Sequence, residues 1–509
     1  RILSDLRLSA SKDLIGETME KSVEVKLKEY NLELLEGEYD RISLFIEDTK
    51  KLNRICRRLN KLTKGAILKA ISSKEFEKKS CGDVLTLSFP GGLQAKYLDL
   101  VKWTRPGQPN DARKAGVNLA KKSNNSKILI CAYAQKFLEE MIKGYLLRRY
   151  EFLNYKSRKN NDIGSVVMML KQPKDFKKAL SETKAIVDGV FFTRNLVNEP
   201  ANILNTVEFS ERLKDLSSLG VDVEVLEENK LAELGMEAFL GVGQGSANPS
   251  KIVIMSWNGS SKKDKPLALV GKGVVFDTGG ISLKPAGGME DMTMDMGGAG
   301  VVAGTMLSLA KRKAKANVVG LVGLVENMPS STAQRPGDIV KSMKGDTIEV
   351  INTDAEGRLV LSDILWYTQE RFKPACIVDL ATLTGAIIVG LGYENAGVFS
   401  NDDKFCQSFL DAASQENEGA WRMPLSSEYD KKLKSRLADM KNVGGRDAGA
   451  ITAAQFIQRF IKEDMPWIHL DIAGVAHTKT ESKYAPSGAT GWGVMSLNRL
   501  ISEKFENRK

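Results

Sequence analysis

An octapeptide with the sequence NTDAEGRL, residues 352–359, carries a dense set of chemically active side chains. The runs on either side of it, residues 347–351 and 359–361, consist mostly of apolar or β-branched residues. Flanks of this kind are typical of buried structure, where an unpaired charge is very costly. Four more charged residues precede the octapeptide in glycine-rich, apolar surroundings: Lys272, Asp277, Lys284 and Asp295. We therefore expect the acidic side chains of this region to surround a bound cation.

The supply of ligands indicates what kind of ion this is. The chain has two histidines, and none of its five cysteines forms a CxxC pair, which argues against zinc sites built from histidine or thiolate. Oxygen atoms must therefore supply most of the metal ligands, and the candidate ligands are Asp277, Asp295, Asp354 and Glu356. Two divalent ions would neutralise these four carboxylates, whereas one ion would leave an excess for Lys284 and Arg358 to balance. Two metals are favoured, and Lys272 could join them as a neutral amine, because a buried lysine beside dications can lose its proton.

The positions of the carboxylates agree with a site at the edge of a sheet. Residues 267–276 read as a buried strand that leads directly into Asp277. Binding sites in open α/β sheets lie beyond the carboxyl ends of the strands. Asp354 and Glu356 are two residues apart, so both side chains would point the same way if their segment is extended. One metal pair could then use both.

Several segments together resemble the leucyl, or cytosol, aminopeptidase family. The resemblance lies in order and spacing as well as composition, over residues 270–285, 295–298, 326–330, 352–359 and 381–385. It covers roughly the last two-thirds of the chain and fades before about residue 175. It implies a hydrolase that releases N-terminal residues from peptides with a free N-terminus, preferring bulky apolar residues such as leucine.

The resemblance also implies a ligand set for each metal. A tighter ion would be held by Lys272, Asp277, Asp295 and Glu356. A looser, exchangeable ion would be held by Asp277, Asp354 and Glu356, with the backbone carbonyl of Asp354 as a further ligand. Zinc or manganese would occupy the sites, with magnesium or cobalt open at the exchangeable one. A hydroxide bridging the metals would attack the peptide carbonyl, while the substrate's α-amine binds the tighter ion.

Two cationic side chains and a pocket complete the site that the resemblance implies. Lys284 would stabilise the tetrahedral oxyanion, and such preorganised donors are typically worth about 3 kcal/mol of barrier. Arg358 would hold a bicarbonate that shuttles the proton, because its planar guanidinium matches a planar oxyanion. The pocket for the N-terminal side chain would include Met292, Thr382, Leu383 and Gly385.

Each of these residues also has an ordinary structural interpretation. Single aspartates beside glycines usually cap helices or form turns, and isolated lysines are usually solvated. Asp354 and Arg358 could form an ion pair in a surface turn, although the apolar flanks argue against that interpretation. His469 lies in an apolar run and is expected to be a core residue rather than a ligand.

Length and patterning predict an α/β protein of two domains, because 509 residues exceed one ordinary domain. Residues 1–174 alternate short apolar runs with lysine-rich helical stretches, as in an N-terminal α/β domain. Residues 175–202 would form a linker helix, over about 175–195, and a connection. Residues 203–509 alternate strands and helices again and would form the catalytic dimetal peptidase domain. Each domain is expected to contain a mixed or mostly parallel sheet flanked by helices.

The apolar stretch at residues 375–393 contains Asp379 and several glycines, so it reads as a buried strand and loop rather than a membrane span. The cysteines show no pairing pattern, which suits a reducing compartment. We expect a cytoplasmic protein that does not bind membranes, or an organellar one if a presequence preceded Arg1.

The charge balance supports an alternative class, a DNA-binding protein with a secondary or vestigial peptidase site. The formal net charge is +10, and basic clusters occur at residues 54–58, 121–122, 148–149 and 311–315. A solvated basic surface is the simpler interpretation, because no recognised DNA-binding motif accompanies the clusters. The resemblance leaves DNA binding open, since some bacterial members of the family bind DNA.

Two further expectations rest on the resemblance. The alternative enzyme activity is that of a narrow dipeptidase, which would act for example on cysteinylglycine. The family is typically hexameric, so a homohexamer is expected.

Overall fold

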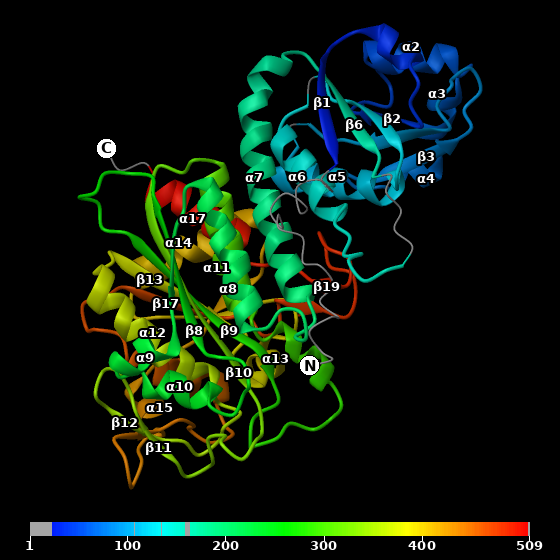
Figure 1. The fold of residues 1–509 in the computed structure, drawn as a ribbon. Coiled ribbons are helices and arrows are strands. Elements are labelled where there is room, and N and C mark those ends of the chain that lie inside the picture. The colour runs from blue at the N-terminus through cyan, green and yellow to red at the C-terminus, as the bar shows by residue number, and fades with distance from the viewer. Residues whose placement is uncertain (1–22, 106, 134, 158–162, 507–509) are drawn as a thin grey trace. The chain divides into compact units, whose positions relative to one another are not determined.

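The computed structural model describes residues 23–105, 107–133, 135–157 and 163–506 (Figure 1). Within these residues the chain forms two compact units. The first comprises residues 23–187 and the short segment Ser482–Pro486, and the second comprises Asp188–Glu481 and residues 487–506. A helix, α7 (Pro173–Asn198), covers the residues at which a linker helix was predicted, and the division between the units falls within it.

The first unit is built on a six-stranded sheet. Its strand order is β1 (Glu24–Glu29), β6 (Ser165–Leu170), β5 (Lys127–Cys131), β2 (Arg41–Ile46), β4 (Tyr97–Lys102) and β3 (Val84–Ser88). All neighbouring pairs are parallel except β3 and β4, which are antiparallel. Its helices are η1 (Leu32–Glu36), α2 (Arg54–Leu62), α3 (Ala66–Ile71), α4 (Lys74–Glu77), α5 (Pro109–Ser123) and α6 (Leu138–Arg148). The mixed or mostly parallel sheet predicted for this part of the chain is confirmed.

The second unit contains an eight-stranded mixed sheet. Its order is β15 (Ala420–Arg422), β14 (Ala396–Ser400), β17 (Trp467–Asp471), β13 (Cys376–Ala381), β9 (Leu267–Asp277), β10 (Asn317–Asn327), β8 (Lys251–Asn258) and β7 (Asp222–Leu226). The four central strands, β17, β13, β9 and β10, are parallel, whereas β14, β8 and β7 run antiparallel to their inner neighbours. The carboxyl ends of the central strands therefore share one edge.

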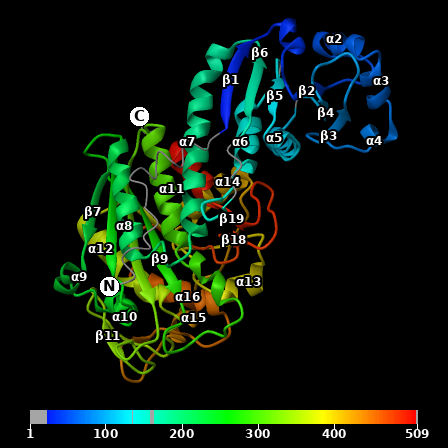
Figure 2. The same cartoon turned by 45° about the vertical axis from the view of Figure 1, so that its right-hand side comes forward.

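Two helices cover opposite faces of this central sheet, α11 (Gly297–Lys311) and α12 (Gly357–Phe372) (Figure 2). Glycine in β9 lets α11 lie close, because a Cβ on Gly271 would be 2.7 Å from the Cα of Ala299. On the other face, a Cβ on Gly323 of β10 would be 2.3 Å from the Cδ1 of Ile364 in α12. Successive residues of a strand point to opposite faces, so Lys272, which follows Gly271, points toward α12.

The remaining elements surround this core. The helices are α8 (Thr206–Lys214), η2 (Asp215–Leu219), α9 (Glu228–Glu233), α10 (Glu237–Gly243), η3 (Met289–Met294), α13 (Gly385–Leu391), α14 (Asp403–Glu416), α15 (Ser427–Lys431), α16 (Gly449–Gln458) and α17 (Val494–Lys504). Two small sheets pair β11 (Ile339–Lys341), β12 (Thr347–Glu349) and β16 (Met440–Lys441), and β18 (His477–Thr478) with β19 (Gly488–Ala489). Among the described residues, no helix is long and apolar enough to span a membrane.

Candidate functional site

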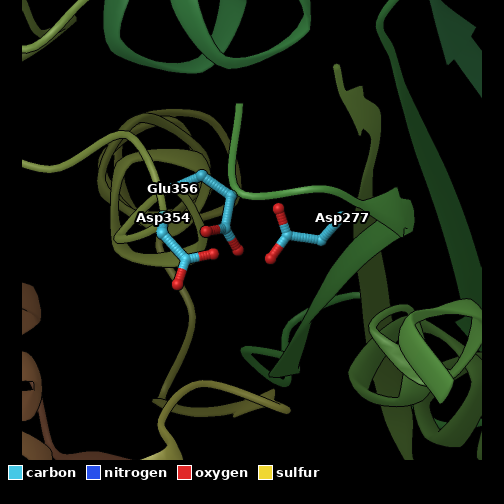
Figure 3. A group of neighbouring side chains, drawn as sticks. All are labelled: Asp277, Asp354 and Glu356. Carbon is cyan, nitrogen blue, oxygen red and sulfur yellow. The ribbon is translucent and has the colours of Figure 1, made fainter. Parts of the chain in front are cut away.

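The predicted carboxylates come together at the carboxyl edge of the central strands. Asp277 is the last residue of β9, Asp295 lies between η3 and α11, and Asp354 and Glu356 directly precede α12. Asp277, Asp354 and Glu356 each offer one oxygen atom, and these atoms all lie within 4.8 Å of one another (Figure 3). Two segments that are distant in the sequence thus supply these three carboxylates, and Asp295 lies beside them through its ion pair with Lys272.

Asp354 and Glu356 do not lie in an extended segment, so strand alternation does not apply to them. Asp354 lies in a turn, in which the N–H of Ala355 donates to the carbonyl of Asn352 at 3.2 Å. Glu356 already has helical dihedral angles, φ −77° and ψ −36°, as the residue before α12. The two carboxylates converge because the turn leads into the helix, and strand alternation plays no part.

Lys272 lies inside this cluster from the middle of β9, where its side chain is 2% exposed. Its Nζ is 2.7 Å from Asp295 Oδ1 and 2.7 Å from Glu356 Oε1, and it donates to the carbonyl of Thr382 at 3.0 Å. Burial by itself lowers the pKa of this lysine, but the charges of Asp295 and Glu356 outweigh it and hold the pKa above its usual value. Added cations would oppose that effect, since they favour the neutral amine.

Lys284 lies at the opposite side of the cluster and is about one-fifth exposed. Its ammonium donates to Asp277 Oδ2 at 2.8 Å and also to Asp354 Oδ1. Burial opposes its charged form, but the surrounding carboxylates raise its pKa above the usual value. Its ammonium therefore remains charged beside the two acids.

The carboxylates are more numerous than the ammonium groups that face them. Burial raises the pKa values of Asp295, Asp354 and Glu356, and nearby acids, including Asp277, add to the effect. Asp295 Oδ2 is buried and has no hydrogen-bond partner among the described residues. Carboxylates that repel one another, together with a buried oxygen that has no hydrogen-bond partner among the described residues, fit divalent cations, which prefer such oxygen ligands.

Arg358, the second residue of α12, is also buried. Its Nη1 donates to the backbone carbonyl of Asn442 at 2.8 Å, while its Nε has no hydrogen-bond partner in the described part of the chain. Burial lowers the pKa of this guanidinium to about 10, although the charges of Glu356 and Asp471 act against the shift. The guanidinium is thus a buried cation with spare donor capacity.

The charged side chains described above line a cavity of about 470 Å³. All of the residues predicted for the site line it: Lys272, Asp277, Lys284, Met292, Asp295, Asp354, Glu356, Arg358, Thr382, Leu383 and Gly385. Apolar residues that the sequence analysis did not single out also line it: Met289, Met294, Ala386, Ile388, Val443 and Ala473. The cavity therefore combines a charged cluster with an apolar wall.

Three polar residues that support the site were also missed. Asn327 donates to Asp277 Oδ1 at 2.8 Å, and Asn442 bonds the turn before α12. Asp471 is fully buried and accepts from the N–H of Leu383 at 3.1 Å. Of these three residues, only Asn327 lies in a segment that resembles the aminopeptidase family in the sequence analysis, residues 326–330. His469 was expected to be a core residue, and it is fully buried with Nδ1 2.5 Å from Asp379 Oδ1.

Comparison with known proteins gives consistent matches. A family model described as the cytosol aminopeptidase family, catalytic domain, matches residues 191–498. A probable cytosol aminopeptidase of Dinoroseobacter shibae is 57% identical over 476 residues, covering 94% of this chain and 97% of that protein. A similar protein of Cereibacter sphaeroides is 54% identical over 484 residues, covering 95% of this chain and 99% of its own length.

Solved structures agree with these relatives. A mutant of tomato leucine aminopeptidase superposes with a TM-score of 0.83 at 31% identity, covering 95% of this chain and 97% of the tomato chain. The bottromycin maturation enzyme BotP in complex with Mn superposes with a TM-score of 0.79 at 29% identity, covering 91% of this chain and 99% of BotP.

Proposed function

This chain belongs to the cytosol aminopeptidase family and is an aminopeptidase, and we propose that two divalent metal ions allow it to hydrolyse the N-terminal peptide bond of peptides. The observation that carries the proposal is the convergence of Asp277, Asp354 and Glu356, whose oxygen atoms lie within 4.8 Å of one another. No other group of acidic, histidine or cysteine side chains of this kind occurs in the described part of the chain.

The proposed ligand sets are those that the resemblance to the family implies. Lys272, Asp277, Asp295 and Glu356 would hold the tighter ion, and Asp277, Asp354 and Glu356 the exchangeable one, with the backbone carbonyl of Asp354. Asp295 Oδ2, which is buried without a hydrogen-bond partner among the described residues, supports a ligand role for Asp295. We propose zinc or manganese, with magnesium or cobalt as occupants of the exchangeable site; the manganese complex of BotP supports manganese. When bound, such ions would lower the pKa of a water from about 15.7 towards roughly 7 and polarise the substrate carbonyl.

Lys284 would act on the oxygen of the scissile carbonyl. Its ammonium lies against Asp277 and Asp354 on the cavity wall, where it can donate to an oxygen that gains negative charge. The cluster around it holds this donor in place before the reaction, and such preorganisation lowers the barrier.

Arg358 would bind a planar anion such as bicarbonate, which would accept and return the proton. The support is its burial beside the cavity and its Nε, which has no hydrogen-bond partner among the described residues. A guanidinium presents paired donors that match a planar oxyanion.

The apolar wall of the cavity would select the N-terminal side chain. Met292, Leu383 and Ile388 offer an apolar surface, while Gly385 has open space where a Cβ would stand. This wall supports a preference for bulky apolar residues such as leucine, because burying an apolar side chain of that size stabilises a complex by about 1.5–3 kcal/mol. A comparison of dipeptides with longer peptides separates this activity from that of a narrow dipeptidase.

We also propose a cytoplasmic homohexamer, which the family membership supports. Light scattering coupled to size-exclusion chromatography tests the oligomeric state, and cell fractionation tests the location.

The deciding experiment measures hydrolysis of a leucine chromogenic amide by the metal-stripped protein, with Mn²⁺ or Zn²⁺ added back. Asp354→Ala and an N-acetylated substrate should each abolish the restored activity. The control is Asp411→Ala, which removes an exposed aspartate on α14. If metal-stripped protein keeps full activity, or if Asp354→Ala responds to metal as the native protein does, the dimetal proposal is wrong.

A further inference from the structure

We propose that Asn442 is a positioning residue for the acidic turn, by which we mean residues 352–356. Its role would be to set the affinity of the exchangeable metal, the one held by Asp277, Asp354 and Glu356. This inference rests on the proposed dimetal function and deepens it.

The side chain of Asn442 is fully buried and uses its amide on both ends of the acidic turn. Oδ1 accepts from the N–H of Ile351 at 2.9 Å and from that of Asn352 at 3.3 Å. Nδ2 donates to the carbonyl of Asn352 at 2.7 Å and to that of Ala355 at 3.4 Å. Asparagine is the residue that offers both two donors and an acceptor at this length.

The backbone of Asn442 adds two more connections. It directly follows β16, which pairs in parallel with β12, and its N–H donates to the carbonyl of Glu349 at 3.0 Å. Its own carbonyl accepts from Arg358 Nη1 at 2.8 Å. One residue therefore joins the strand before the acidic turn, the turn itself and the first turn of α12.

The acidic turn depends on such outside contacts because it has no regular secondary structure of its own. Thr353, its second residue, is held by the loop after β9, since its Oγ1 donates to the carbonyl of Gly279 at 2.6 Å. Asn352 and Ala355 are held by Asn442 instead. Ala355 lies between Asp354 and Glu356, so the hydrogen bond from Asn442 to its carbonyl restrains the backbone that carries both carboxylates.

Replacing Asn442 should weaken the binding of one metal more than that of the other. Asn442 makes no hydrogen bond to Lys272, Asp277 or Asp295 among the described residues. The tighter ion would keep these three of its four proposed ligands in place, whereas the exchangeable ion depends on the acidic turn for two of its three side-chain ligands. Changes to residues that orient metal ligands typically cost about 10–100-fold in metal affinity.

The test is calorimetric titration of the metal-stripped full chain with Mn²⁺, for the native protein, Asn442→Ala and Asn442→Asp. The aspartate variant keeps the shape of the side chain but loses both N–H donors. We expect the weaker dissociation constant to rise about 10–100-fold in both variants, and the tighter one, which depends on the acidic turn only through Glu356, to rise much less. At limiting Mn²⁺ the peptidase activity should fall, and saturating Mn²⁺ should restore most of it.

The matched control is Asn498→Ala. Asn498 is also a buried asparagine, whose Nδ2 donates to the carbonyl of Val494 at 3.0 Å and whose Oδ1 accepts from Ser308 Oγ at 3.0 Å. It belongs to α17 and does not line the cavity. This variant should lose stability without changing either metal constant.

The outcomes separate the two proposals. Native constants in both Asn442 variants, an equal loss at both sites, or the same loss in Asn498→Ala would overturn the role of Asn442. Native protein that binds fewer than two ions would overturn the dimetal function itself, and this inference with it. Circular dichroism checks that each variant folds, and if Asn442→Ala does not, the isosteric Asn442→Asp decides the question.

Discussion

Replacing Gly357 by alanine should disable the site while leaving the fold intact. Gly357 is the first residue of α12, and a Cβ there would lie 2.7 Å from Cε and 2.8 Å from Cδ of Lys272. Carbon atoms in contact are normally about 3.5–4.0 Å apart, so the lysine would have to withdraw by roughly 1 Å. If the side chain of Lys272 withdraws, its Nζ moves away from Asp295 and Glu356, each of which is 2.7 Å from it in the native structure.

The expected magnitude follows from this displacement. A misplacement of about 1 Å can cost roughly 100-fold in rate, so kcat/KM should fall by about two orders of magnitude, or about 2.7 kcal/mol. Stability should change little, because alanine favours a helix over glycine by up to about 1 kcal/mol and offsets part of the clash.

The assay compares kcat/KM, Mn²⁺ affinity and thermal unfolding of Gly357→Ala with those of Gly390→Ala. Gly390 is also a helical glycine, in α13, but a Cβ there would meet nothing within 4 Å. The control should keep its activity and gain slightly in stability. Native kcat/KM and native metal affinity in Gly357→Ala would refute the reasoning that its missing side chain makes room for Lys272.

Three further changes test other parts of the site and fold. Lys284→Met should lower kcat by about 10²–10³-fold, whereas an effect confined to KM would exclude a role in oxyanion stabilisation. Mn²⁺ at about 100 times its dissociation constant should stabilise the native chain by about 2.7 kcal/mol, and a thermal shift of the same size in Asp295→Asn would exclude Asp295 as a ligand. Burial raises the pKa of Asp363 to about 7, so its folded state holds the proton more tightly than the unfolded chain. Stability from this group is therefore full below the unfolded pKa, near 3.8, and is lost as the pH rises through about 7. Asp363→Asn should flatten that decline in urea unfolding between about pH 4 and 7, and an unchanged slope would contradict it.

Local sequence patterns predicted the regular elements well. The apolar run at residues 267–276 is β9, and the helix expected over about 175–195 is α7 (Pro173–Asn198). These predictions succeeded because periodicity and helix limits are local properties. The turn at Asp354 and Glu356 could not be read from the local pattern, because the backbone there is bonded to partners far along the chain, chiefly Asn442 and the loop after β9.

By itself, the sequence determined the chemical inventory: oxygen-rich acidic ligands, two lysines and an arginine, in the order and spacing that identified the family. The tertiary structure decided which atoms meet. It brought Asp295 to Lys272 across 23 residues and Asp354 to Lys284 across 70, and it closed an apolar wall around them. It also made the outer strands β14 and β8 antiparallel and gave Asn442 its place behind the acidic turn. The reason is physical. Residue types and the periodicity of apolar residues are properties of short stretches of sequence, whereas the angles and contacts at a site arise from packing between segments that are distant in the chain.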